Sequence, residues 1–363
     1  MKKIKFLAVA LAAFTMFSCT NDEVENLGNN VPGEQAVLTI KLKGDGDNQA
    51  QSRAAGEALD ADDVTINNYL VFLFREGGAL DCAPHYSASG ATATISNGTT
   101  AAKKAYVIAN TGALASGPFA TVKTEADLLA VAGSLMDNTN SASTQTKTNL
   151  WMSGVNDVTF NDTKGTAAVS LSFVAAKIQL IVKDNRTGMS GGTIQIEDKE
   201  VVLLFAGQSG KFFGTQKSVQ THFYTGDDSY NGAFKTNVTK STALSDQVTT
   251  PFTDNTGNTV FNHFYTFGND GTTQPTILAI KSTKTVNSAA STIYYPVHFT
   301  TADAKETIEP GKSYTVTVTL NGDVETGAGG GTTDPEAPVI SSSIEVTVTA
   351  AQWVTQPVDK EFN

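Results

Sequence analysis

Near its C-terminus the chain contains the segment Ser343-Ile344-Glu345-Val346-Thr347-Val348-Thr349-Ala350-Ala351-Gln352-Trp353-Val354. Apolar and polar residues alternate along it, and one face is formed by Ile344, Val346, Val348 and Ala350. A period of two is typical of a β-strand that buries one face. The segment is therefore predicted to be a half-buried strand.

A glycine-rich stretch separates this strand from the rest of the chain. Residues 322–338 contain the run Gly329-Gly330-Gly331 and two prolines, a composition typical of a flexible linker. A strand on such a linker can complete its own sheet or pair with another molecule. The pattern of residues 339–363 alone leaves both interpretations open.

A second strand of the same design lies near the N-terminus. Residues 36–43 alternate in the same way, and Leu38, Ile40 and Leu42 share the apolar face. The polar loop that follows contains Arg53-Ala54, and Arg53 is one of three arginines in the chain. Exposed segments of small residues are preferred sites of proteolysis. A removable first strand and a tethered last strand of matching pattern suggest that one replaces the other.

Length and composition indicate an all-β secreted protein. At 363 residues the chain is long enough for about two domains of ~150 residues each. Charged residues make up only 17% of the chain, whereas Gly, Thr, Ala, Asn and Ser are abundant. The net charge of −11 argues against nucleic acid as a partner, because binding to phosphates needs clustered Lys and Arg.

The N-terminus has the features of a targeting signal. Three lysines precede the apolar residues 6–17, which are too few to span a bilayer. The segment ends in Ser18-Cys19 and resembles a bacterial lipoprotein signal, in which Cys19 is lipidated and becomes the first mature residue. The alternative is an ordinary signal peptide with an incidental cysteine. Cys82 then has no partner, so we expect a buried free thiol rather than a disulfide framework.

The middle of the chain predicts many strands and one helix. The helix is expected over Thr124–Met136, because Thr124 and Asp127 have the spacing of a capping box and an apolar stripe follows. At 169–182 the alternating pattern changes phase, which indicates a bulge or a strand that crosses between domains. Residues 207–259 are irregular and are expected to form surface loops. The predicted divisions are a signal at 1–19, a spacer and removable strand at 20–53, domains at 54–170 and 171–321, the linker at 322–338 and the last strand at 339–363.

The sequence offers no catalytic, metal or cofactor motif. Its four histidines are isolated, and the segment with Asp60, Asp62 and Asp63 lacks the rest of a calcium motif. No phosphate-binding loop or nucleophile elbow is present in the sequence. We therefore predict that the protein is not an enzyme and has no cofactor.

Taken in order, several segments resemble the fimbrillins, the subunits of the protease-assembled type V pili of gut and oral anaerobic bacteria. The last strand, 344–354, carries the resemblance best. The others are Cys19, the strand at 36–43, Arg53-Ala54, Tyr106-Val107-Ile108-Ala109-Asn110-Thr111-Gly112 and Ile308-Glu309-Pro310-Gly311-Lys312-Ser313-Tyr314. Together they span nearly the whole chain.

The resemblance implies two transthyretin-like β-sandwich domains and a lipoprotein precursor at the outer membrane. An Arg-specific surface protease would cut after Arg53, leave Ala54 as the new N-terminus and release the strand that carries Leu38, Ile40 and Leu42. The groove would accept the donor strand of a neighbouring subunit, with the residues Ile344, Val346, Val348 and Trp353. The implied product is a shaft subunit of adhesive cell-surface fimbriae. Its partners would be further copies of itself, anchor and tip subunits, the protease and, as candidates, host surface ligands.

Two other interpretations remain open at this point. A glycan-binding surface lipoprotein could use Trp151 or the pair Tyr294-Tyr295 as a stacking platform, although a buried tryptophan is the simpler interpretation. A structural lipoprotein could also remain monomeric and uncut.

Overall fold

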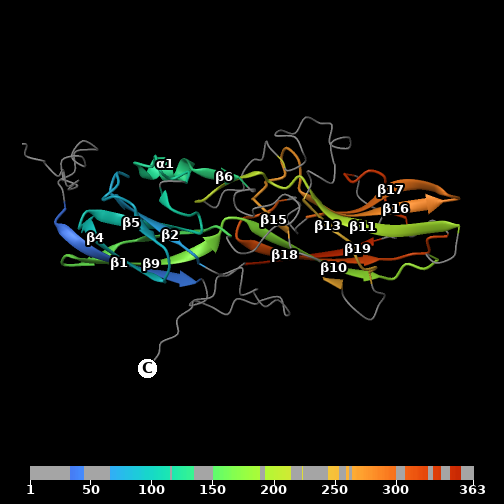
Figure 1. The fold of residues 1–363 in the computed structure, drawn as a ribbon, viewed down its shortest axis with the longest axis horizontal. Coiled ribbons are helices and arrows are strands. Elements are labelled where there is room, and N and C mark those ends of the chain that lie inside the picture. The colour runs from blue at the N-terminus through green and yellow to red at the C-terminus, as the bar shows by residue number, and fades with distance from the viewer. Residues whose placement is uncertain are drawn as a thin grey trace, which may run out of the picture.

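The computed structural model describes residues 33–44, 66–114, 117–134, 150–188, 193–213, 223, 244–252, 259–260, 264–299, 307–325, 330–336 and 344–352. The molecule is elongated, with two β-domains arranged along its long axis (Figure 1). One short helix accompanies the strands, and no helix in the described ranges is long and apolar enough to cross a membrane. The predicted all-β class is confirmed.

The N-terminal domain is built on an eight-stranded sheet. Its strands follow the order β3 (His85–Ser87), β2 (Tyr69–Arg75), β5 (Ala102–Ala109), β7 (Met152–Asp157), β9 (Lys164–Phe173), β1 (Gln35–Gly44) and β4 (Thr92–Thr99), with β8 (Thr159–Asn161) also paired to β9. All seven residues of β2 are buried. Its continuous apolar run predicts this position in the core.

The C-terminal domain consists of two further sheets. One has the order β14 (Thr259–Val260), β10 (Ala176–Asp184), β18 (Lys312–Leu320) and β19 (Ile344–Gln352), with β15 (Phe264–Thr266) also on β10. The other has the order β13 (Leu244–Gln247), β11 (Ile194–Leu204), β16 (Ile277–Val286) and β17 (Ala289–His298). β10 and β18 run parallel, and β19 runs antiparallel to β18.

The chain passes between the domains where the alternating pattern changes phase. In β9 the odd-numbered residues from Gly165 to Phe173 are buried, whereas in β10 the even-numbered ones are. Val174 and Ala175 connect the two strands and are buried themselves. Each strand thus turns its apolar face to the core of its own domain.

The predicted helix is shorter than its sequence suggests. Helix α1 covers only Glu125–Ala130, although Thr124 and Asp127 do form the predicted capping box. Val131 is already extended, and β6 (Ala132–Ser134) pairs with β12 (Ser209–Lys211). A β-carbon at Gly133 would lie 2.1 Å from the Trp151 ring, so this close strand packing requires glycine. Tertiary pairing thus overrides the helical pattern.

Aromatic side chains fill the space between the two domains. The Phe212 ring lies 4.8 Å, centroid to centroid, from both Phe119 and Trp151. The expectation of surface loops over 207–259 is wrong for the described part, because Phe212 and Phe223 are buried and β12 and β13 are strands. Most residues around Phe212 and Phe223 are polar, so the sequence pattern did not predict that these two rings are buried.

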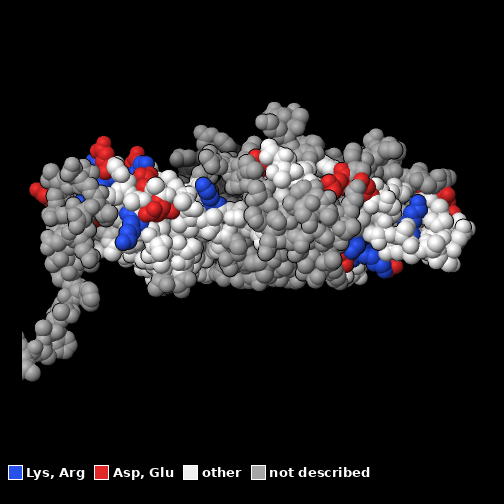
Figure 2. Space-filling model, turned by 90° about the horizontal axis from the view of Figure 1, so that it is seen from above, with Lys and Arg blue, Asp and Glu red and all other residues white. Residues whose placement is uncertain are grey.

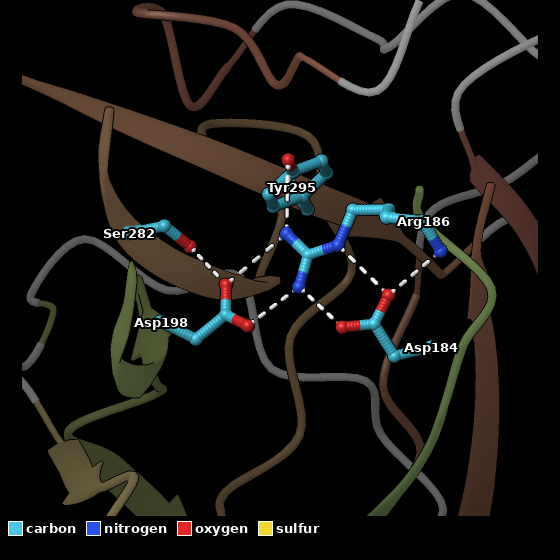
Figure 3. A network of polar contacts seen from close by, with 5 residues as sticks. All are labelled: Asp184, Arg186, Asp198, Ser282 and Tyr295. Carbon is cyan, nitrogen blue, oxygen red and sulfur yellow. Dashed lines mark hydrogen bonds and ion pairs between the residues drawn. The ribbon is translucent and has the colours of Figure 1, made fainter. Parts of the chain in front are cut away.

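A buried ionic cluster joins the two sheets of the C-terminal domain (Figure 3). The Arg186 guanidinium forms ion pairs of 2.6 Å with both Asp184, at the end of β10, and Asp198 of β11. It also donates to the Tyr295 hydroxyl, and Ser282 donates to Asp198. Asp184 and Asp198 lie two and twelve residues from Arg186 in the sequence, whereas Ser282 and Tyr295 join the cluster only through the fold.

Candidate assembly site

The first strand occupies an internal position in the N-terminal sheet. β1 pairs antiparallel with β4 on one side and parallel with β9 on the other (Figure 1). A strand in this position satisfies its backbone on both edges and holds its neighbours together. We call the space that β1 occupies between β4 and β9 the slot.

The apolar face of β1 fills the slot as its pattern predicts. Leu38 and Ile40 are completely buried, and Leu42 is partly buried against the core. Val37, on the opposite face, is 46% exposed, and Lys41 is exposed as well. Removing β1 would therefore uncover the apolar core residues against which Leu38 and Ile40 pack.

Two glycines shape the slot around Leu38. A β-carbon at Gly98 of β4 would lie 2.3 Å from Cδ1 of Leu38, and one at Gly165 of β9 would lie 3.0 Å from its Cγ. The Phe160 ring covers Gly165 from β8. The pairing of β1 with β4 shifts between Ala36 and Leu38, which places an irregularity beside the same side chain. We call the space between Gly98, Gly165 and Phe160 the Leu38 pocket.

A buried carboxylate holds one wall of the Leu38 pocket. Asp81 accepts hydrogen bonds from the backbone amide of Thr99 at 2.7 Å and from its hydroxyl at 2.5 Å. It also forms a 2.9 Å ion pair with Arg75, and both side chains are nearly inaccessible to solvent. Thr99 follows Gly98 directly, so Asp81 fixes the end of β4 that forms the pocket.

The neighbouring thiol of Cys82 is half-buried and has a raised pKa. Cys82 is a free cysteine, as its lack of a partner predicts. Burial raises the pKa of its thiol to about 12, and the charge of Asp81 adds to the shift. A protonated thiol is a poor nucleophile and metal ligand.

The last strand lies at the edge of the C-terminal sheet. The register of β19 places Ile344, Val346 and Val348 opposite Leu320, Val318 and Val316. Those three residues of β18 are buried. In this monomer β19 therefore occupies the position that the simpler interpretation assigns to it, on its own sheet.

Parts of the preceding linker are anchored to the same domain. Val324 is buried, and its amide donates to the carbonyl of Thr187. Further along, Thr332 and Tyr294 exchange backbone hydrogen bonds of 2.7 and 2.9 Å. The glycine-rich composition of 322–338 gives no sign of these contacts.

Four of the residues predicted to act in assembly belong to segments that the structure does not describe. Cys19, Arg53, Ala54 and Trp353 lie outside the described residues, as does the aspartate group at 60–63. The described residues contain no cluster of His, Cys, Asp and Glu that could hold a metal.

The rings considered for sugar stacking are not free platforms. Trp151 is only 6% exposed and packs on Phe212 and Phe267, and Tyr295 is completely buried under Arg186. Tyr294 is half-buried beside the anchored linker. On the surface shown in Figure 2, acidic and basic side chains are intermixed where residues are described. The burial of these rings therefore gives no support for sugar stacking on them.

The fold, with paired β-sandwich domains and a last strand behind a long linker, is that of a fimbrial subunit. Residues 175–353 match the family model for the C-terminal domain of the FimA-like major fimbrial subunit protein. A crystal structure from Bacteroides eggerthii DSM 20697, described as a "putative cell adhesion protein", is 72% identical. The match covers 92% of this chain and 100% of that one, with a TM-score of 0.80.

More distant structures share the fold alone. The fimbrilin FimA from Porphyromonas gingivalis W83 is 18% identical, with a TM-score of 0.60 over 90% of this chain and 100% of that one. The tip fimbrial protein Mfa3 from Porphyromonas gingivalis is 13% identical, with a TM-score of 0.50 over 88% and 100% of the two chains. No curated protein matches the sequence.

The chain belongs to the fimbrillin family. It is a structural, non-enzymatic subunit of cell-surface fimbriae and assembles with other fimbrial subunits.

Proposed function

We propose that this protein is a shaft subunit that polymerises head to tail by donor-strand exchange. The position of β1 carries the proposal. β1 lies inside a sheet, and its covalent link to the strands that follow runs through residues 45–65, which contain Arg53. A cut after Arg53 would leave β1 held by non-covalent contacts alone. Ala54 would then be the new N-terminus.

The cut would act as a switch because it changes the effective concentration of β1. A strand that is covalently tethered to its domain occupies its slot at an effective concentration of about mM. Burial of Leu38 and Ile40 contributes roughly 1.5–3 kcal/mol each, and the backbone hydrogen bonds about 0.5–1.5 kcal/mol each. Once the tether is cut, a second strand at high local concentration can compete for the slot.

The donor in this proposal is β19 of a neighbouring subunit. Its apolar residues Ile344, Val346 and Val348 match the pattern of Leu38, Ile40 and Leu42. β19 leaves a single neighbour among the described strands, β18, and in the slot it gains two, β4 and β9. Exchange thus replaces one ladder of hydrogen bonds by two.

Contacts outside the slot are also needed. Burial of three large apolar side chains contributes roughly 5–9 kcal/mol, whereas association costs about 4–15 kcal/mol. Trp353 follows β19 directly and is the candidate to extend the interface. The proposed filament therefore requires contacts between successive subunits beyond those in the slot.

The same cut would also free the subunit from the membrane. The precursor would be held at the outer membrane by lipid on Cys19, which precedes β1 in the chain. Cleavage after Arg53 by an Arg-specific surface protease removes both the anchor and β1. Anchor and tip subunits would bind the two ends of the filament, and host surface molecules are candidate ligands for the assembled fimbria.

A pair of substitutions tests the proposal. We expect Arg53→Ala subunits to keep residues 36–43 and to remain monomeric, while the neighbouring Ser52→Ala is cut and assembles. The measurement is electron microscopy of surface filaments together with the mass of the mature subunit. Normal filaments from uncut Arg53→Ala subunits would contradict the proposal.

A further inference from the structure

We infer that the Leu38 pocket is a preformed anchor site for one branched apolar side chain of the donor strand of a second copy of this chain. The inference rests on the proposed donor-strand exchange and adds to it the place where the donor is selected by side-chain size. Its elements are Gly98, Gly165, Phe160 and Asp81.

The pocket is fitted closely to its present occupant. Leu38 is completely buried, and the two glycines approach it to distances that leave no space for a methyl group at either position. Ile40 is buried as completely, but both glycines of the slot contact Leu38, and Leu42 is only partly buried. The strongest steric selection in the slot thus falls on the side chain at position 38.

Contacts outside β1 help to hold both walls of the pocket, although β4 pairs with β1 alone among the described strands. Asp81 is held by Arg75 of β2 and by Thr99 of β4, and none of its partners among the described residues belongs to β1. On the other wall, Phe160 lies on Gly165 through the pairing of β8 with β9. These contacts do not involve β1, so they hold the Gly98 end of β4 and the Gly165 wall in its absence, and a site held in advance binds at a lower cost of ordering.

The apolar face of β19 offers two side chains that can serve as the anchor. If the donor runs in the direction of β1, Ile344 takes the place of Leu38, and if it runs in the opposite direction, Val348 does. Val346 takes the place of Ile40 in both directions and never reaches the pocket. Val346 is thus the internal control for any size effect.

Because cleavage removes β1, the effect of a pocket substitution on the donor strand can be measured apart from its effect on β1. Gly98→Ala narrows the pocket, and adding Leu38→Ala gives the precursor room to fold. Because the cut removes position 38, the mature subunit then differs from the parent only at Gly98→Ala. Circular dichroism and the mass after cleavage verify that this subunit is folded and processed.

We expect the mature Gly98→Ala subunit to polymerise roughly 10–100-fold more slowly than the parent, the range for one extra methyl group in a packed site. Adding Ile344→Ala or Val348→Ala should restore the rate, although either change alone slows the parent. Adding Val346→Ala should not restore it. A double-mutant cycle from light-scattering rates gives the coupling.

Each outcome has one meaning. Rescue by one end residue and not by Val346→Ala supports the anchor pocket and reveals the direction of the donor. Unchanged assembly of the Gly98→Ala subunit, or equal effects of all three donor changes, would overturn the pocket while donor exchange stands. Parent filaments that retain β1 would instead refute the proposed function itself.

Discussion

Asp81 and Arg75 illustrate how a single ion pair supports the slot. The two side chains are inaccessible to solvent, and the carboxylate also holds the amide and hydroxyl of Thr99. A buried pair adds little net stability over an apolar replacement, but removing one partner leaves an isolated buried charge. The pair therefore acts as a positional constraint on the end of β4.

We predict that Asp81→Ala lowers the free energy of unfolding by about 3–5 kcal/mol, the usual cost of stranding one member of a buried pair. The control is Asp157→Ala, which alters an exposed carboxylate of β7 and should change stability little. Urea denaturation of the uncut precursor measures both. Equal stabilities of the two variants would show that the pair does not hold the domain.

The thiol of Cys82 should respond to pH in a defined direction. Its pKa is raised to about 12 in the folded protein, from an ordinary value of 9.0. The stability that the folded protein gains by keeping this thiol protonated is therefore fully present below pH 9 and is lost as the pH rises through 12. At pH 8 we expect iodoacetamide to label the folded protein far more slowly than the urea-unfolded protein. Equal labelling rates would contradict the burial of this thiol.

At the scale of elements, strands with a clear period of two could be predicted from the sequence. The apolar faces of β1 and β18 lie where their alternation indicates, because one buried face dictates such a pattern. The ribbon of β6 and β12 could not be predicted, since each strand has three residues and the two lie far apart in sequence. Gly133, inside a predicted helix, was its only local sign.

The site was predictable only in part. The matching patterns of the first and last strands predicted that either of the two could occupy the slot. The Leu38 pocket was hidden because Asn97-Gly98 has the composition of an ordinary turn. Asp81 was hidden too, because its partners Arg75 and Thr99 come together only in the folded sheet.

The two faces of β19 should differ sharply in what they tolerate. Val346→Asp places a charge on the face that would enter the slot, where an unpaired charge costs several kcal/mol. Thr347→Asp places the same charge on the other face, where we expect little effect. In seeded assembly of cut subunits, Val346→Asp should abolish donation, and Thr347→Asp should polymerise nearly as well as the parent.

The acceptor function offers a control for this prediction. Val346→Asp subunits retain an intact slot, so they should still bind a donor from parent subunits and appear at one end of a filament. Similar behaviour of the two variants would show that β19 is not inserted through its apolar face.

At the scale of the molecule, the two domains form one continuous unit. The β6–β12 ribbon and the rings of Phe119, Trp151 and Phe212 connect them. The strands β1 and β19 belong to different domains of this unit (Figure 1). In the proposed exchange, an acceptor in one domain and a donor in the other make a heterologous, head-to-tail contact. Such contacts generate open filaments when rotation does not close a ring.

In the proposed filament, β19 of one subunit replaces β1 of the next. The most direct test is the mass composition of purified filaments after denaturation. Donor-strand exchange predicts a single subunit species that begins at Ala54 and no peptide containing residues 36–43. Filaments whose subunits retain residues 36–43, covalently or as a stoichiometric peptide ending at Arg53, would contradict it.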